Sequence, residues 1–194
     1  MKTIMDILTP SNIQFMIFTG AKYSLLLAIG ALFFGVILGI IGAALKLSKH
    51  FVLRAIGNVY VEIFRGTPML LQIMFLYLAV PTVVQSITGQ RFQADPYVCG
   101  LIAMSLNSGA YQVELIRSGI LGVDKGQWEA CETIGLNYVQ TMRYVILPQA
   151  FKRIIPPLIS EFITLIKDSS LIFTIGAVEL LATASVIGAN TFNY

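Results

Sequence analysis

Two carboxylates stand out in an otherwise apolar part of the chain. Glu161, Thr164 and Asp168 follow the spacing i, i+3, i+7, so a helix would place both carboxylates on one face, two turns apart. A charged side chain in apolar surroundings is costly unless it meets an opposite charge or a ligand. This acidic face suits an ammonium group or a basic side chain, and we expect it to bind a substrate or line its path. The alternative is that both carboxylates pair with other segments and hold the fold together.

A second group of polar side chains has a similar spacing. Asn107, Tyr111 and Glu114 lie at i, i+4 and i+7, which places them on one helical face. We expect them to line the same binding site or pathway. Glu114 has an alternative, because Arg117 follows it at i+3, and opposite charges at that spacing pair on helices.

The residues around Asp168 also predict a break in the helix. The apolar region from Ile154 to Val186 would be about 50 Å long as one straight helix, whereas the hydrocarbon core of a membrane is about 30 Å thick. The polar run of Lys167, Asp168, Ser169 and Ser170 is the expected place, because irregular backbone is tolerated where it lines a cavity. Lys167 points about 100° away from Asp168 around the helix, so it reaches the site only if the helix unwinds there. We include Lys167 and Ser169 among the expected pathway residues.

The composition indicates an integral membrane protein. Of the 194 residues, 56% are hydrophobic and 12% are charged, compared with about 25% charged residues in a typical soluble domain. The net charge of +3 does not indicate a nucleic-acid-binding surface. The two cysteines, Cys99 and Cys131, have no metal-binding or redox spacing, so we expect neither a disulfide scaffold nor a metal site.

The apolar regions predict an all-α fold. The longest uncharged run extends from Tyr23 to Leu45, and it is longer than the stretch of about 20 residues that is needed to cross a bilayer. We expect a second span over 66–84, with a helical pattern that extends back through Val59 and Ile63, and a third over 96–113. The broken region described above is the fourth. No linker separates these regions, so we predict one transmembrane domain over 1–194.

Lys and Arg counts in the loops predict the orientation. The first loop holds Lys46, Lys49 and Arg54, and the third loop, within 117–153, holds five basic residues, whereas the second loop holds only Arg91. We therefore expect the first and third loops in the cytoplasm and the N-terminus outside.

Small residues recur every four positions along the first span, at Ala31, Gly35, Gly39 and Ala43. Small residues at this spacing let two helix backbones approach closely in a membrane. They indicate either packing within one chain, which we favour, or contact with a second copy.

The third loop predicts a rigid protrusion built from two short helices. Residues 127–134 are expected to form the first helix, with Gly135 in the left-handed position that follows it. Asn137 and Gln140 are typical of a capping box that opens the second helix, which Pro148 is expected to end or kink. Such a protrusion suits docking into another protein.

This loop resembles the "EAA" loop of the membrane subunits of ABC-type importers. The pattern is Glu-Ala-Ala, three residues, Gly, nine residues, Ile, one residue and Leu-Pro. Its spacing agrees throughout with Glu129, Ala130, Cys131, Gly135, Val145, Leu147 and Pro148. Cys131 replaces the second Ala and Val145 replaces Ile.

Two further segments resemble permeases for polar amino acids. Residues 60–68, YVEIFRGTP, together with Leu70, Leu71 and Gln72, are similar to the second span of these permeases. Residues 167–171, KDSSL, are similar to a segment late in the same subfamily.

The resemblance implies a permease subunit of an ATP-driven importer of the histidine, glutamine and arginine class, with the transmembrane fold of type I importers. It implies that the subunit lies in the bacterial plasma membrane, pairs with an identical or related permease, docks two ATPase subunits and receives substrate from an extracytoplasmic binding protein. ATP and Mg would be bound by the ATPase subunits. The chain itself has no phosphate loop of the pattern Gly-x4-Gly-Lys-Ser/Thr, so we expect no cofactor on it.

Coupling to the ATPase is expected from one face of the protrusion. Trp128 would anchor its first helix and Glu129 would offer a carboxylate to a basic residue of the ATPase. The full set of expected coupling residues is Trp128, Glu129, Ala130, Cys131, Gly135, Leu147 and Pro148.

The family pattern has about five spans, the last of which is missing from this chain, so we expect a truncated sequence. An ion-coupled secondary amino acid carrier is the alternative function, because such carriers also place charges at mid-depth and use broken helices.

Overall fold

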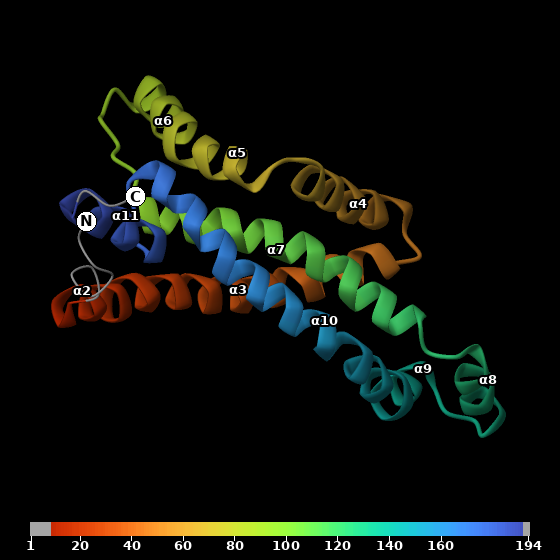
Figure 1. The fold of residues 1–194 in the computed structure, drawn as a ribbon. Helices are drawn as coiled ribbons and strands as arrows, with labels where there is room; N and C mark the ends of the chain where they lie inside the picture. The colour runs from red at the N-terminus through yellow and green to blue at the C-terminus, as the bar shows by residue number, and fades with distance from the viewer. Residues whose placement is uncertain (1–8, 192–194) are drawn as a thin grey trace.

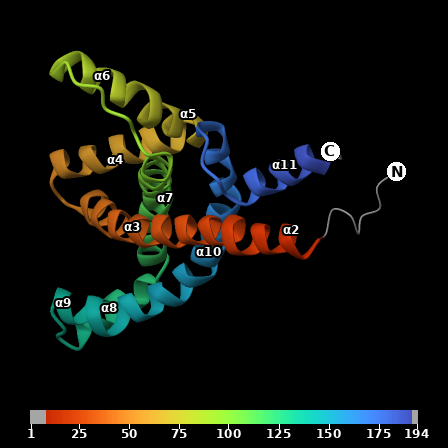
Figure 2. The ribbon, with the colours of Figure 1, turned by 90° about the vertical axis from the view of Figure 1, so that its left-hand side faces the viewer.

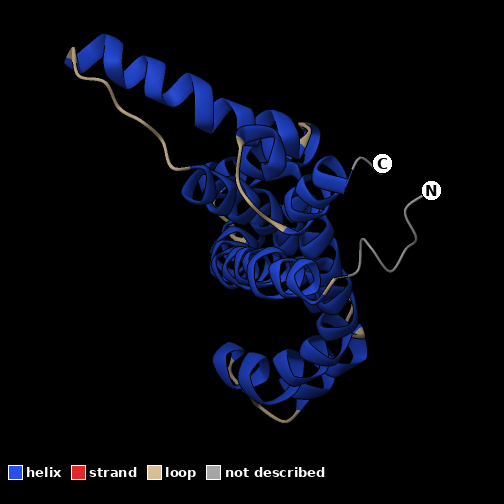
Figure 3. Cartoon of the chain, turned by 60° about the vertical axis from the view of Figure 1, so that its left-hand side comes forward, coloured by secondary structure: helices blue, strands red, loops and turns tan. Residues whose placement is uncertain are grey.

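Helices form nearly all of the part that the computed structural model describes, residues 9–191, and no strand occurs within that range (Figure 3). Three of the short elements are π-helical, η1, η2 and η3, and η4 is a 3-10 helix. In chain order the elements are α2 (Pro10–Gln14), η1 (Phe15–Ala21), α3 (Lys22–Leu47), α4 (Phe51–Gly66), α5 (Met69–Met74), η2 (Phe75–Ala79), α6 (Val80–Thr88), α7 (Pro96–Leu121), α8 (Lys125–Thr133), α9 (Tyr138–Thr141), η3 (Met142–Ile146), α10 (Leu147–Asp168), η4 (Ser169–Ile175) and α11 (Leu180–Thr191).

Two continuous helical rods are long and apolar enough to cross a membrane. The first, Pro10–Leu47, has 38 residues, contains an 18-residue stretch with a mean hydropathy of 2.7, and begins before the predicted start at Tyr23. The second, Met69–Thr88, has 20 residues and contains an 18-residue stretch with a mean hydropathy of 1.8. The helices over 138–175 and 180–191 also qualify if they are counted together as one bent span.

The predicted third span, within α7, does not reach the same hydropathy as these rods. Asp95 begins this helix, because its side chain accepts a hydrogen bond from the Val98 backbone N–H. Buried polar side chains, including Ser105, Asn107 and Gln112, lower the hydropathy of α7. They are tolerated because α7 packs between other helices of the chain, where protein replaces lipid around them.

The prediction of one helical pattern from Val59 through the second span was wrong. Helix α4 ends at Gly66, Thr67 is extended with φ −118° and ψ 143°, and α5 begins only at Met69. Pro68 explains the break, because its ring disfavours the helical conformation at the preceding residue and it has no N–H to donate.

The predicted region does contain a break, but the break lies later than expected. The helical run passes through residues 167–170, where α10 changes into the tighter η4, and it is interrupted only after Ile175, at Gly176, whose φ is +86°. Only a residue without a Cβ adopts this left-handed conformation at little cost. The chain then turns by 56° into α11.

The two short helices of the predicted protrusion are confirmed. Asp124 caps α8, Gly135 has φ +77°, and Asn137 and Gln140 form the capping box of α9. Pro148 does not end the second helix, because α9, η3 and α10 continue as one helical run that contains it. The wide π-helical turn η3 directly precedes α10, and it accommodates a residue that lacks a backbone N–H in the first turn of α10.

Figure 1 shows α2 and α11 at one end of the molecule and α8 and α9 at the other. Seen after a 90° turn, α8 and α9 project away from the part formed by α3, α4 and α7 (Figure 2).

The small-residue face of α3 packs against α7 of the same chain, as favoured above. A Cβ atom added at Gly39 would lie 2.7 Å from the Gln112 Cβ, and one added at Gly35 would lie 2.7 Å from the Gln112 Nε2. The two backbones therefore approach as closely as glycine permits.

This packing makes a testable prediction. We expect Gly39→Ala to lower the free energy of unfolding by about 1–3 kcal/mol, because the added methyl forces α3 and α7 apart. Thermal unfolding of the purified protein in detergent measures the effect. Gly66→Ala is the matched control, because a Cβ there has no atom within 4 Å. Equal melting temperatures for the two variants would contradict this account of the packing.

Candidate functional site

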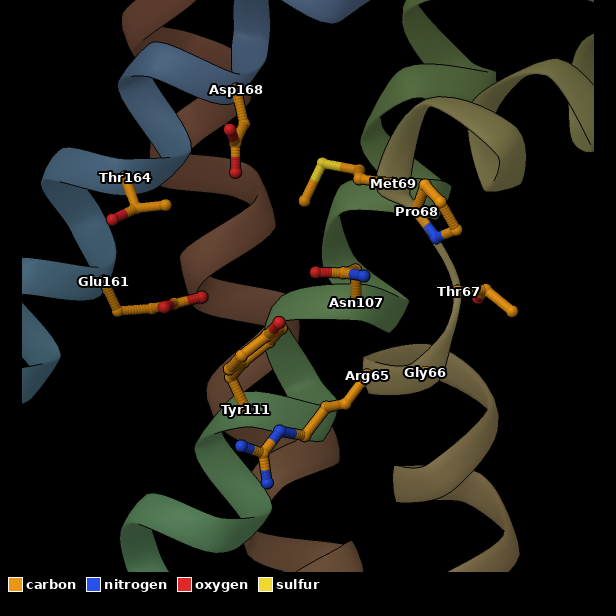
Figure 4. Close-up of a pocket in the computed structure, with 10 residues that line it drawn as sticks. All are labelled: Arg65, Gly66, Thr67, Pro68, Met69, Asn107, Tyr111, Glu161, Thr164 and Asp168. Atoms are coloured by element: carbon orange, nitrogen blue, oxygen red, sulfur yellow. The ribbon is translucent and has the colours of Figure 1, made fainter.

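A cavity of about 530 Å³ lies where α4 and α5 separate, facing α7 and α10 (Figure 4). The residues that line it come from these four helices and the α4–α5 break, and they are Arg65, Gly66, Thr67, Pro68, Met69, Asn107, Tyr111, Glu161, Thr164 and Asp168. Within 9–191 no group of three or more His, Cys, Asp or Glu is placed to hold a metal ion.

Five of the predicted site residues meet in this cavity, namely Asn107, Tyr111, Glu161, Thr164 and Asp168. They form the two helical faces that the spacing indicated. Helix α10 packs against α7, so the polar faces of these two helices border the same space.

The two carboxylates of α10 differ in their partners. Ser108 Oγ donates a hydrogen bond of 2.9 Å to Glu161 Oε1, and Gln112 Nε2 donates one of 3.0 Å to Ser108 Oγ. This chain of hydrogen bonds orients the Glu161 carboxylate. The Asp168 carboxylate makes no hydrogen bond or ion pair with the described residues, and it points into the cavity (Figure 4). It is therefore the carboxylate with the greater capacity to bind a ligand.

Arg65 is a site residue that the spacing analysis missed. Its guanidinium carbon lies 4.9 Å from the centre of the Tyr111 ring, in a cation–π contact between α4 and α7. Arg65 belongs to the segment that resembles permeases, and Asn58 and Glu62 precede it at helical spacing. Only the packing of α4 on α7 brings it beside Tyr111.

Thr164 lines the cavity, but its hydroxyl is engaged elsewhere. Thr164 Oγ1 donates a hydrogen bond of 3.1 Å to the backbone oxygen of Ser160. Figure 4 shows this oxygen turned away from the other lining residues, with the methyl group on the cavity side.

Lys167 and Ser169 are not brought to the cavity. Ser169 is buried and donates a hydrogen bond to the Ile166 backbone oxygen, and Lys167 is exposed. The helix continues through Asp168, so successive side chains still point about 100° apart. The two neighbours of Asp168 therefore face other directions.

Glu114 lies below the cavity, in an ion-paired cluster. It pairs with Lys46 of α3 and with Arg117, whose Nη2 lies 2.8 Å from Glu114 Oε2. The expected pairing of Glu114 with Arg117 at i+3 is confirmed. Lys46 is a second partner, which local spacing could not reveal because it lies on another helix. Glu114 also lines a second cavity of about 500 Å³, which shares Arg65, Tyr111, Glu161 and Thr164 with the first. The shared lining makes the two cavities neighbours along α7 and α10.

The predicted coupling residues divide between the surface and the interior of the protrusion. Glu129, Ala130, Gly135 and Pro148 are exposed, whereas Cys131 is buried and Leu147 is half-buried. Trp128 is half-buried and stacks on Tyr138, with ring centres 6.3 Å apart. It also packs against a buried apolar cluster, as does Leu147, and the cluster consists of Ile120, Val123, Ile146, Ala150 and Ile154. Trp128 therefore anchors α8 to its own chain.

Comparison with known proteins identifies relatives along almost the whole chain. Residues 35–194 match the family described as "Binding-protein-dependent transport system inner membrane component". The L-cystine transport system permease protein of Bacillus subtilis is 44% identical over 174 residues, which are 90% of this chain and 71% of the relative. The arginine transport system permease protein of the same organism is 38% identical over 178 residues, which are 92% of this chain and 78% of the relative.

A solved structure has the same fold. The crystal structure of an amino acid ABC transporter with histidines superposes with a TM-score of 0.82 at 35% identity, covering 92% of this chain and 80% of that one. The fold is thus the transmembrane fold of type I ABC importers. These relatives give no support to the alternative of an ion-coupled secondary carrier.

The packing of Trp128 makes a prediction about the protrusion. We expect Trp128→Ala to raise the rate of amide hydrogen exchange in α8 by about tenfold, because losing about 1.4 kcal/mol of contacts shifts local opening by that factor. Hydrogen exchange with mass spectrometry on the purified protein measures it. Tyr144→Ala serves as the control, because this side chain is 63% exposed. Unchanged exchange in α8 of the Trp128 variant would show that other contacts hold the helix.

Proposed function

The chain belongs to the family of binding-protein-dependent transport system inner membrane components, and from this premise we propose that the amino acid carried by the importer binds in the cavity between α4, α7 and α10. Members of the family are permease subunits of ABC importers and are not themselves enzymes. The chain is accordingly the permease subunit of an amino acid importer.

The observation that carries the proposal is the set of opposed charges in one cavity. Arg65 supports binding of an α-carboxylate, because a guanidinium group can donate two parallel hydrogen bonds to it. Glu161 and Asp168 support binding of an ammonium or guanidinium group from the opposite side. Two carboxylates against one guanidinium leave one negative charge unmatched by a neutral amino acid. The charge balance therefore favours a substrate with a basic side chain, such as arginine.

We expect the carboxylates to determine affinity. In the purified complex of permease and ATPase subunits, Asp168→Asn should weaken binding of radiolabelled L-arginine by about tenfold, because it removes one charge-assisted contact. Glu161→Gln should weaken it as well. Equilibrium binding of L-arginine, L-glutamine and L-cystine gives the measurement.

Glu132→Gln is the matched control, because it removes a carboxylate on the exposed surface of α8, away from the cavity. The site would be rejected if both cavity variants bound all three amino acids with unchanged affinity.

We further propose that the segment 117–153 is the coupling loop of a single transmembrane domain, 1–194. Its exposed Glu129 and Ala130 would contact an ATPase subunit, which would also hold ATP and Mg. Support comes from the connection of α8 to the cavity. Gln149 Nε2 of α10 donates a hydrogen bond of 3.0 Å to Gln127 Oε1 of α8, and the same helical run continues to Asp168. Movement of α8 with the ATPase would therefore displace the carboxylates of α10.

The proposed assembly contains two permeases, two ATPase subunits and an extracytoplasmic binding protein. In the plasma membrane, the end with α8 and α9 would face the cytoplasm, because it adjoins the most basic loop (Figure 1). The opposite end, with α2 and α11, would face the binding protein.

Two variants of the protrusion test the coupling. We expect Glu129→Lys and Gly135→Asp to abolish amino-acid-dependent ATP hydrolysis while the protein still inserts in the membrane. The first reverses a surface charge, and the second forces a side chain into φ +77°. ATPase activity of the reconstituted complex is the readout, with Thr133→Ser as a control on the same helix. Normal coupling in both variants would show that this surface does not contact the ATPase.

A further inference from the structure

A side chain to which the proposed function gives no role donates hydrogen bonds to the residues at the break between α4 and α5. Gln72 of α5 is only 8% exposed. Its Nε2 donates hydrogen bonds to the Phe64 oxygen at 3.0 Å, the Thr67 oxygen at 3.1 Å and Thr67 Oγ1 at 2.9 Å. The carbonyls at the end of a helix lack donors within it, so Gln72 supplies donors to the end of α4.

The same amide connects the break to α7. Gln72 Oε1 accepts a hydrogen bond of 3.2 Å from Asn107 Nδ2, which also donates one of 2.9 Å to the Phe64 oxygen. Asn107 is 5% exposed. Both amides thus lie in a buried network with the backbone of α4.

The orientation of both amides follows from the backbone. Carbonyl oxygens can only accept hydrogen bonds, so Gln72 must direct its NH₂ group toward Phe64 and Thr67. Its oxygen is then left for Asn107, which must present its own NH₂ group. Asn107 Oδ1 makes no hydrogen bond within the described residues, and Figure 4 shows it directed into the cavity, toward α10.

We propose that Gln72 is a positioning residue that holds the Asn107 amide with its oxygen facing the cavity, where this oxygen accepts a hydrogen bond from the α-ammonium group of the substrate. The inference rests on the proposed function of the cavity. An amide oxygen attracts an ammonium group and repels a carboxylate. The network therefore orients an amino acid with its ammonium group between Asn107 and the α10 carboxylates and its carboxylate toward Arg65.

The test measures how strongly the site prefers an α-ammonium group. The probes are L-arginine and its deaminated counterpart, 5-guanidinopentanoate, and likewise L-glutamine and 4-carbamoylbutanoate. The ratio of the dissociation constants within each pair is determined for the purified complex of permease and ATPase subunits. A purely structural defect lowers the amount of active complex and leaves this ratio unchanged.

Two substitutions at Gln72 separate orientation from stability. Gln72→Met has a similar size but no hydrogen-bonding amide. The hydrogen bond to the Phe64 oxygen is then the only one left to orient the Asn107 amide, and we expect the ratio to fall about tenfold. Gln72→Glu still accepts from Asn107 Nδ2, so the ratio should stay near that of the wild type although the melting temperature falls. If the Gln72→Met complex does not assemble, Gln72→Lys replaces it. The lysine ammonium group only donates hydrogen bonds, so it would attract Asn107 Oδ1 away from the cavity. We expect the same fall of about tenfold in the ratio of dissociation constants.

A double variant tests whether Gln72 acts through Asn107. With Asn107→Ala present, adding Gln72→Met should not change the ratio further. A further tenfold fall in this background, or an unchanged ratio in Gln72→Met alone, would overturn the inference. If the charge-removing variants of α10 weaken binding while Gln72→Met keeps the ratio, only the inference fails. If the wild-type complex binds none of these amino acids, both the proposed function and the inference fail.

Discussion

The break between α4 and α5 at Thr67 and Pro68 is the constraint on which the site depends. Thr67 is extended and Pro68 has no backbone N–H, so the last carbonyls of α4 lose their intrahelical donors. Backbone of this kind is tolerated at membrane depth only where protein or a water-filled cavity satisfies it. Here the amides of Gln72 and Asn107 do so. The same interruption leaves the space of the cavity and places Arg65 over the Tyr111 ring.

The polar face of α7 exists because α3 shields it. Glycines on α3 leave room for the Gln112 side chain, and a Cβ in their place would approach it to 2.7 Å. Gln112 then donates to Ser108, and Ser108 donates to Glu161 on α10. This run of hydrogen bonds joins α7 to α10 and ends at the cavity. Gln112 Oε1 is the one buried side-chain polar atom in the described range without a hydrogen-bond partner.

Helix α10 joins the protrusion to the cavity, the two regions that are proposed to function together. The helical run through α9, η3 and α10 reaches from the protrusion to Asp168 without a break. Trp128 and Cys131 bury one side of α8 against this run and leave Glu129 on the outside. A continuous helical connection of this kind transmits displacement better than a flexible loop.

Periodicity within single helices was readable from the amino-acid sequence. The spacing of Glu161, Thr164 and Asp168, the left-handed Gly135 and the capping box at Asn137 all depend on neighbours a few residues away, and each has the predicted local structure. Composition likewise indicated the membrane, and the loop pattern indicated the family that the comparisons established.

Contacts between helices were decided only by the tertiary structure. Arg65 beside Tyr111, Lys46 beside Glu114, and Asn107 bound to the Phe64 backbone 43 residues away join separate helices. Their sequence spacing has no period that could reveal them. The continuation of the helix through Pro148 likewise depends on the π-helical turn before it. Local spacing determines which face of a helix a side chain occupies, whereas the packing of whole helices determines what that face meets.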